Sequence, residues 1–155
     1  MLRRPARKAG HGDRQVPKKF GDLVHADHII ANSDEAIGLT GDRSALAMVD
    51  RFSDYKDCFP LTTKDADEAH GALLEYFGRL CPKYMRTDSA PEHVRAIADM
   101  KVLHGKATSS PHQNNGYCER VVRKIVEGAR AIFGHAVLPR CFWTFAVRYW
   151  CLMDN

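Results

Sequence analysis

The sequence predicts an α/β fold in which a five-stranded mixed sheet is flanked by helices. Three observations lead to this prediction. The first half of the chain carries three short apolar runs separated by turn residues, which is typical of an antiparallel meander. Two further strand-like runs alternate with helical segments. The last third has apolar residues at steps of three and four, which indicates helices.

The three N-terminal strands are expected at 23–31, 44–53 and 55–63. A polar loop over residues 32–43 separates the first two, and a tight turn near Asp54 separates the second from the third. The first strand is mostly apolar, but Asp27 interrupts it.

The remaining elements alternate helices with single strands. A helix is expected to follow Asp65, because acidic residues fill its first turn and Pro82 ends it. Its expected buried stripe is Ala66, Ala69, Leu73, Tyr76 or Phe77, and Leu80. After it we expect a strand over 84–88, a helix over 91–100, a strand within 101–109 and a long helix over about 115–134. A last helix begins at Pro139, since proline is favoured at the first helical position.

Composition favours one domain with a sizeable core. The chain has 155 residues, of which 45% are apolar, and this argues against global disorder. It holds no apolar run of about eighteen residues, so we expect no membrane span, and the N-terminus lacks the apolar segment of a secretory signal. Five cysteines without Cys-x-x-Cys spacing indicate reduced, mostly core thiols in an intracellular protein without a zinc module.

Residues 1–19 are predicted to be a basic linker that precedes a domain over residues 20–155. The chain has a net charge of +4, and seven cations stand in this linker against a single acid, Asp13. Its prolines and glycines favour an extended chain. Contact with nucleic-acid phosphates and a merely solubilising tail both remain open as interpretations.

Three carboxylates are candidate metal ligands. Asp27 interrupts an apolar strand, where a lone charge is costly unless it is paired or bound to metal. Asp88 ends the fourth strand, and ligands of α/β proteins collect beyond strand ends. Glu119 opens the long helix. Each has a structural alternative. Asp27 could hydrogen-bond a loop or lie on a solvated strand face, and Asp88 could form an Asx turn or a helix cap. Glu119 could pair with Arg123.

The three carboxylates are more informative together. The first strand is central in a meander of this kind and the fourth pairs beside it, so Asp27 and Asp88 can face each other. The start of the long helix can bring Glu119 across the sheet. Three converging carboxylates repel unless a cation neutralises them, and hard oxygen ligands favour Mg²⁺ or Mn²⁺. Two such ions about 3.5–4 Å apart can activate an attacking oxygen and stabilise the leaving one.

Several stretches, in order, resemble the catalytic cores of retroviral and retrotransposon integrases, especially those of copia-type elements. They are GDLVHAD at 21–27, the segment 49–67, RTD at 86–88, SSPHQNNGYCER at 109–120 and LPRCFWTFA at 138–146. Asp27, Asp88 and Glu119 match the family's DDE triad, with a step of 31 residues between the last two. The chain departs from the family pattern at Ser89-Ala90, where Asn-Gly is frequent, and at Cys118, where a small aliphatic residue is more usual.

The resemblance covers about Phe20 to Asn155 and implies a ribonuclease-H-like fold. It also implies a polynucleotidyl transferase that trims a DNA 3′ end and joins it to target DNA. By position, Asp27 would bridge two metal ions, Asp88 would hold one and Glu119 the other. The residues that match the family's DNA-contacting loop and helix are Gln113, Asn115, Gly116, Arg120, Arg123 and Lys124. Turn chemistry and a solvated helix face stay open as alternatives for these six.

The implied partners are element-end DNA, target DNA and further copies of the chain, in the nucleus or a retroelement particle. The family's zinc module and third domain are not in this sequence, so we expect a core truncated out of a longer polyprotein. Three other interpretations stay open. They are a decayed or domesticated core that binds DNA or a partner without catalysis, a nuclease without strand transfer, and an oligomerisation domain built on the aromatic last helix. His28 is not expected to bind metal. His112 could contact DNA or orient a water, but a surface histidine is the simpler interpretation, and Trp143 and Trp150 are read as core or interface aromatics.

Overall fold

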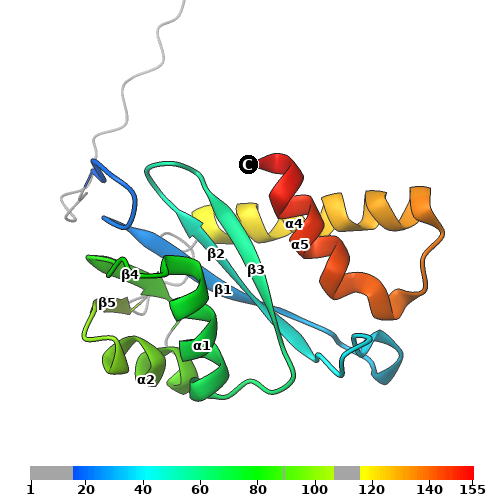
Figure 1. Ribbon diagram of the computed structural model, residues 1–155, viewed down its shortest axis with the longest axis horizontal. Helices are drawn as coiled ribbons and strands as arrows, with labels where there is room; N and C mark the ends of the chain where they lie inside the picture. The colour runs from blue at the N-terminus through cyan, green and yellow to red at the C-terminus, as the bar shows by residue number, and fades with distance from the viewer. Residues whose placement is uncertain (1–15, 89, 107–115) are drawn as a thin grey trace, which may run out of the picture.

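A mixed sheet of five strands organises the structure, a computed structural model that describes residues 16–88, 90–106 and 116–155 (Figure 1). The strands are β1 (Val24–Ile30), β2 (Ser44–Asp50), β3 (Lys56–Leu61), β4 (Tyr84–Thr87) and β5 (Leu103–Lys106). Their order is β3-β2-β1-β4-β5, with the first three antiparallel and with β4 parallel to both β1 and β5. The predicted central position of β1 is confirmed, and the architecture is compatible with a ribonuclease-H-like fold.

Helices cover both faces of this sheet (Figure 1). They are α1 (Ala66–Phe77), α2 (Pro91–Asp99), α4 (Gly116–Ala136) and α5 (Trp143–Asp154), with short 3-10 turns η1 (Asp34–Ala36) and η2 (Arg140–Phe142). Two hydrophobic cores lie between the sheet and its helices. One is formed with α1 and α2 on one face, and the other with α4 and α5 on the opposite face. Among the described helices, none is both long and apolar enough to cross a membrane.

The two cores follow the alternation of the strands. Val24 and Ala26 of β1 contribute to the core under α1 and α2, while Ile29 packs toward α4 and α5. In the second core, α4 and α5 pack directly against each other. Here a Cβ added at Gly128 would lie 2.1 Å from the indole ring of Trp150, so only glycine fits this crossing without a shift.

Two helix boundaries differ from the sequence-based expectation. Helix α1 begins as predicted, with the Asp65 carboxylate accepting a hydrogen bond from the Glu68 backbone N–H at 2.9 Å. It ends at Phe77 because Gly78 adopts a φ of 57°, so Leu80 leaves the helical periodicity and is 61% exposed rather than buried. At the other boundary, Pro139 precedes the turn η2 and α5 itself starts at Trp143.

The hairpin between β2 and β3 is fixed by one fully buried carboxylate. Asp50 accepts hydrogen bonds from the backbone N–H groups of Gly21 at 2.8 Å, Phe52 at 3.1 Å and Ser53 at 2.8 Å, and from the Ser53 hydroxyl at 2.8 Å. Three of these bonds go to Oδ2 and one to Oδ1, so both oxygens of the buried carboxylate are satisfied. Asp50 thus has a structural role in this hairpin.

Candidate active site

Asp27 lies on β1, and Asp88 follows directly after the neighbouring strand β4. The parallel pairing of β1 with β4 sets Val24 opposite Met85 and His25 opposite Arg86. If the same offset continued for two residues, Asp88 would stand opposite Asp27. Because Val24 and Ala26 face α1 and α2, alternation turns Asp27 toward the face that α4 covers. The strand order thus places two of the three predicted carboxylates in the same part of the sheet, near the end of β4.

The Asp27 carboxylate is half-buried and electrostatically strained. Burial raises the pKa of Asp27, and the charges of Asp88 and Glu119 raise it further. Its Oδ1 accepts a hydrogen bond from the backbone N–H of His28 at 2.8 Å. Among the described residues, nothing donates to Oδ2, so one oxygen is free to meet a cation.

Asp88 stands just beyond β4 with a half-exposed side chain. Its Oδ1 accepts hydrogen bonds from Nδ1 of His93 at 2.5 Å and from the backbone N–H of Ala90 at 3.4 Å. The bond from His93 is the main reason that the pKa of Asp88 is lowered. Ala90, not Asp88, occupies the N-cap position of α2 and makes no side-chain cap. The helix-cap alternative for Asp88 is therefore wrong, whereas a weak turn-like contact to Ala90 is present.

Glu119 lies on the first turn of α4 and is exposed. Its alternative role was an ion pair with Arg123, but Glu119 forms no ion pair with any residue that the structure describes. The neighbouring Cys118 is buried, and its thiol has a raised pKa, first because of burial and then because of the charges of Asp27, Glu119 and Asp88. All three carboxylates therefore act on the same small region beside β1.

The three carboxylates do not form a complete metal-binding site among the described residues. Within residues 16–88, 90–106 and 116–155, no three His, Cys, Asp or Glu side chains are arranged to hold a metal ion. Carboxylates of like charge repel one another unless a cation lies between them. The donor set itself suits a hard divalent ion, because it consists of carboxylate oxygens with free positions.

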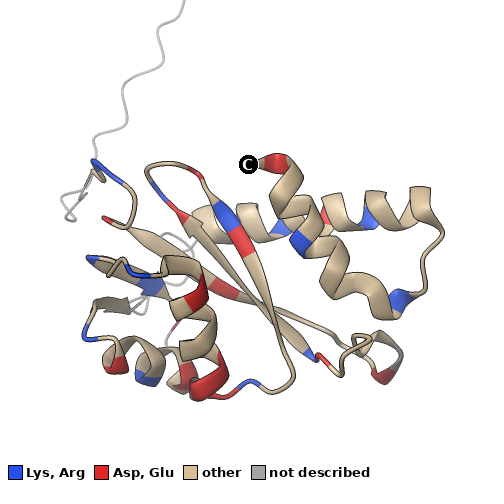
Figure 2. Cartoon of the chain, in the orientation of Figure 1, with Lys and Arg blue, Asp and Glu red and all other residues tan. Residues whose placement is uncertain are grey.

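The predicted DNA contacts are only partly within the described chain. Gln113 and Asn115 lie outside it, as do residues 1–15 of the expected basic linker. Gly116 begins α4, and a Cβ added there would meet nothing within 4 Å. The predicted cations of α4 are exposed, and Figure 2 shows basic residues along this helix. Lys124 is engaged, because its Nζ lies 2.7 Å from the carboxylate of Asp154.

Sequence reasoning missed His93, which contacts the second carboxylate directly. His93 lies on the buried stripe of α2 with Ala96 and Ile97, so its spacing indicates only a core position. His28 does point away from Asp27 toward the opposite face, as alternation predicts, and there its ring stacks on His93. No local signal in the sequence links a residue of β1 to one of α2.

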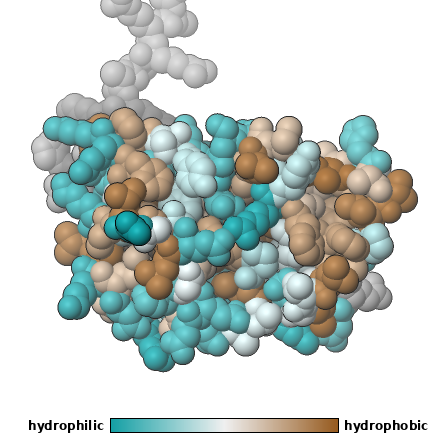
Figure 3. Space-filling model, viewed as in Figure 1, coloured by the Kyte–Doolittle hydropathy of each residue, from teal (hydrophilic) through white to brown (hydrophobic). Residues whose placement is uncertain are grey.

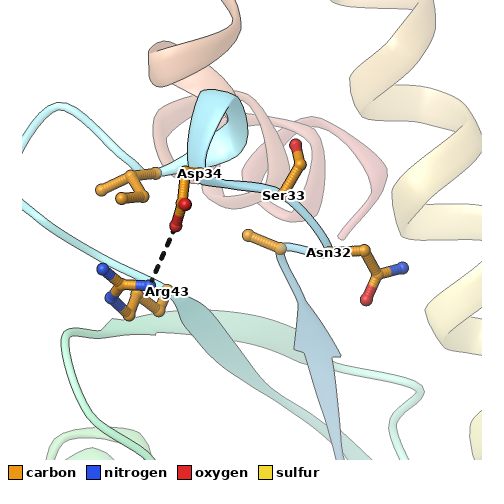
Figure 4. Close-up of a pocket in the computed structure, with 6 residues that line it drawn as sticks. Asn32, Ser33, Asp34 and Arg43 are labelled. Atoms are coloured by element: carbon orange, nitrogen blue, oxygen red, sulfur yellow. Dashed lines mark ion pairs between the residues drawn. The ribbon is translucent and has the colours of Figure 1, made fainter.

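A separate polar pocket lies where β1 ends (Figure 4). It is lined by Ala31, Asn32, Ser33, Asp34, Ile37 and Arg43. An ion pair of 3.5 Å joins Arg43 to Asp34, but both side chains are largely exposed, so the pair contributes little. None of the predicted site residues lines this pocket.

Comparison with known proteins relates the chain to a retroelement polyprotein. No family model matches the sequence. The chain is 28% identical over 144 residues to the retrovirus-related Pol polyprotein from transposon TNT 1-94 of Nicotiana tabacum. The match covers 86% of this chain but only 11% of that polyprotein, so the chain spans about a tenth of its relative. The chain is thus similar to one region of a retroelement polyprotein.

Proposed function

We propose that this chain is an integrase-type catalytic core, a metal-dependent polynucleotidyl transferase that trims and joins DNA. The observation that carries the proposal is that Asp27 lies on β1 and Asp88 just beyond its parallel neighbour β4, with the charges of both Asp88 and Glu119 raising the pKa of Asp27. The strand order and the similarity to a Pol polyprotein support the same conclusion. The whole polyprotein's activities are not implied.

The proposed cofactor is a pair of Mg²⁺ or Mn²⁺ ions. Asp27 would bridge the two ions, Asp88 would hold one and Glu119 the other. When bound, the ions neutralise charge and polarise oxygens for in-line displacement at a phosphodiester. The chain's contribution is positioning: Oδ1 of Asp27 and Oδ1 of Asp88 are each held by a hydrogen bond, which leaves the second oxygen of each to face the ion.

DNA is the proposed substrate, and the exposed side of α4 is the proposed contact. Arg120 is the next residue after Glu119, and Arg123 follows one helical turn later. Neither forms an ion pair with a described residue, so both are available to phosphates. Lys124 would first have to leave Asp154. Gly116 would let a DNA strand approach the helix start, since it has no side chain there.

Self-association is the proposed assembly, through α5. Phe145, Tyr149, Leu152 and Met153 are each more than half exposed and recur along one side of this helix. Figure 3 shows apolar surface in the region that α5 occupies in Figure 1. An exposed apolar stripe of this kind is typical of an interface between protein copies. The expected location, the nucleus or a retroelement particle, remains a prediction.

A second candidate function is a core that binds DNA without catalysis. It is favoured by the absence of a gathered three-carboxylate cage among the described residues. The two functions differ in one respect that can be measured, since only the first makes new phosphodiester bonds.

The test is a reaction of the full chain with Mn²⁺ and labelled DNA that carries the element's terminal sequence. We expect both trimmed and joined products on a denaturing gel. Trimmed products alone would assign a nuclease without strand transfer. DNA retained in a shift assay with no product would assign the non-catalytic core and overturn the proposal.

Glu119→Gln is the decisive variant, with Glu127→Gln as its matched control on the same helix. Glu119 is exposed and unpaired with described residues, so its substitution should change the free energy of unfolding by less than about 0.5 kcal/mol. We expect it to abolish product formation. Glu127→Gln should leave product formation unchanged. Equal activity of the two variants would remove Glu119 from the site.

A further inference from the structure

The imidazole of His93 is buried and makes one hydrogen bond with the described residues. Its side chain is 2% exposed, and Nδ1 lies 2.5 Å from Oδ1 of Asp88. A carboxylate only accepts, so Nδ1 carries the proton and donates it. Nε2 is buried with no hydrogen-bond partner among the described residues. His93 therefore directs its one satisfied polar group at Asp88.

This arrangement is costly for a group that serves only packing. A buried polar atom without a partner is unfavourable, and a phenylalanine of similar shape would avoid that cost. The core position on α2, beside Ala96 and Ile97, would accept such a ring. The imidazole is thus better explained by what its Nδ1–H does for the carboxylate than by the core around it.

His28 fixes the plane of the His93 ring from the other side. The two rings are nearly parallel, with an angle of 9° between them and centroids 4.5 Å apart. Neither nitrogen of His28 has a hydrogen-bond partner within the described residues, so its role here is the stack. His28 follows Asp27 on β1, which links the strand of the first carboxylate to the orientation of the second.

We infer that His93 is a positioning residue for Asp88. By holding Oδ1, it aims Oδ2 outward and removes the rotational freedom that the carboxylate would otherwise lose on binding a cation. This inference rests on the proposed function, because it takes Asp88 as a metal ligand. Outer-shell partners of metal ligands typically change metal affinity by about 10- to 100-fold.

Three substitutions separate the hydrogen bond from the packing. His93→Phe keeps a ring that can stack on His28 but removes the donor. His93→Asn keeps an N–H donor near the place of Nδ1, whereas His93→Gln moves the amide toward the place of Nε2. His135→Asn, an exposed histidine in the last turn of α4, is the matched control.

The measurement is Mn²⁺ binding to the full chain by titration calorimetry, beside thermal unfolding without metal. We expect His93→Phe and His93→Gln to weaken Mn²⁺ binding at least 10-fold. His93→Asn should stay within about threefold of wild type, and His135→Asn should match it. His93→Phe should unfold at the wild-type temperature or above. If His93→Phe does not fold, the contrast between Asn and Gln decides.

Two failures are distinguishable. If Asp88→Asn loses Mn²⁺ binding while His93→Phe and His93→Gln bind as wild type does, the positioning role of His93 is overturned and the metal centre stands. If wild type binds no Mn²⁺, or Asp88→Asn binds it equally well, the metal centre itself is overturned, and the role of His93 with it.

Discussion

The hydroxyl of Tyr117, on the first turn of α4, donates a hydrogen bond to the carboxylate of Asp54 in the turn between β2 and β3. The guanidinium of Arg51 lies 4.0 Å from the centre of the same ring, and the ring of His25 packs edge-on at 5.4 Å. Asp54 reaches this position with a φ of 59°, a left-handed conformation that aspartate tolerates better than most residues. The start of α4, and with it Glu119, is thereby tied to the hairpin and to β1.

Tyr117→Phe should loosen this start of α4. The substitution keeps the ring against Arg51 and removes only the hydroxyl, which stays protonated at neutral pH because burial and the bond to Asp54 raise the pKa of Tyr117 to about 12. We expect faster amide hydrogen exchange over residues 117–120 and a loss of about 0.5–1.5 kcal/mol in the free energy of unfolding. Tyr149→Phe, exposed on α5, is the control. Unchanged exchange at 117–120 would show that packing alone holds the helix start.

Gly128→Ala should destabilise the protein although alanine favours helices. A methyl group at Gly128 would meet the ring of Trp150 at 2.1 Å, so α4 and α5 must separate or the indole must move. Overpacking of this kind costs about 1–3 kcal/mol, against a propensity gain of about 1 kcal/mol. We expect a net loss of up to about 2 kcal/mol in urea unfolding.

The control for this substitution lies on the same helix. Gly134 is exposed on α4, and a Cβ added there would meet nothing within 4 Å. Gly134→Ala should therefore gain about 0.5–1 kcal/mol from helix propensity and the reduced entropy of the unfolded chain. Equal effects at the two glycines would mean that the contact between α4 and Trp150 does not limit packing.

The fold could be predicted because its signals are local. Alternating apolar residues marked the strands, steps of three and four marked the helices, and hairpin turns set the antiparallel order of the first three strands. The presence of Asp27 and Asp88 on and just beyond adjacent strands then follows from β1 being central and β4 pairing beside it. The errors at Leu80 and Pro139 are boundary errors, where one residue's backbone conformation ends a periodic pattern.

The surroundings of the site could not be predicted because they depend on contacts between distant elements. His93 and His28 are 65 positions apart in sequence yet stack, and Tyr117 and Asp54 are 63 apart yet bond. No periodicity encodes such pairs. Metal binding by Asp27, Asp88 and Glu119 and DNA contact by the predicted residues of 113–124 remain predictions.

Asp154→Asn should make stability less dependent on pH in acid. Asp154 lies 3.0 Å from the buried Nζ of Lys56 and 2.7 Å from Lys124, and hydrogen bonds from Lys124 and Lys56 lower the pKa of Asp154 below its ordinary value of 3.8. A depressed carboxyl pKa adds stability above 3.8 that is lost as the pH falls through the folded-state value. The variant should be weaker by about 1–2 kcal/mol at pH 7.

The measurement is urea unfolding of wild type and Asp154→Asn between pH 7 and pH 3. The difference between them should stay constant down to about pH 5 and shrink below about pH 4. Asp34→Asn is a suitable control, because the ion pair of Asp34 with Arg43 is solvent-exposed and should add almost nothing at any pH. A difference that grows in acid would contradict the assigned ion pairs.

The cations of α4 should differ in how much each contributes to DNA binding. Arg123 is exposed and pairs with no described residue, whereas Lys124 must give up Asp154 before it can meet a phosphate. Each cation that contacts phosphate adds about one to the slope of log affinity against log salt. We therefore expect Arg123→Ala to lower that slope by about one on a non-specific duplex, and Lys124→Ala to lower it by less.

Asp154→Asn should raise affinity at low salt by releasing Lys124. A slope that falls equally in both alanine variants would show that the ion pair to Asp154 does not compete with DNA, and a slope unchanged in both would remove this face of α4 from the interface.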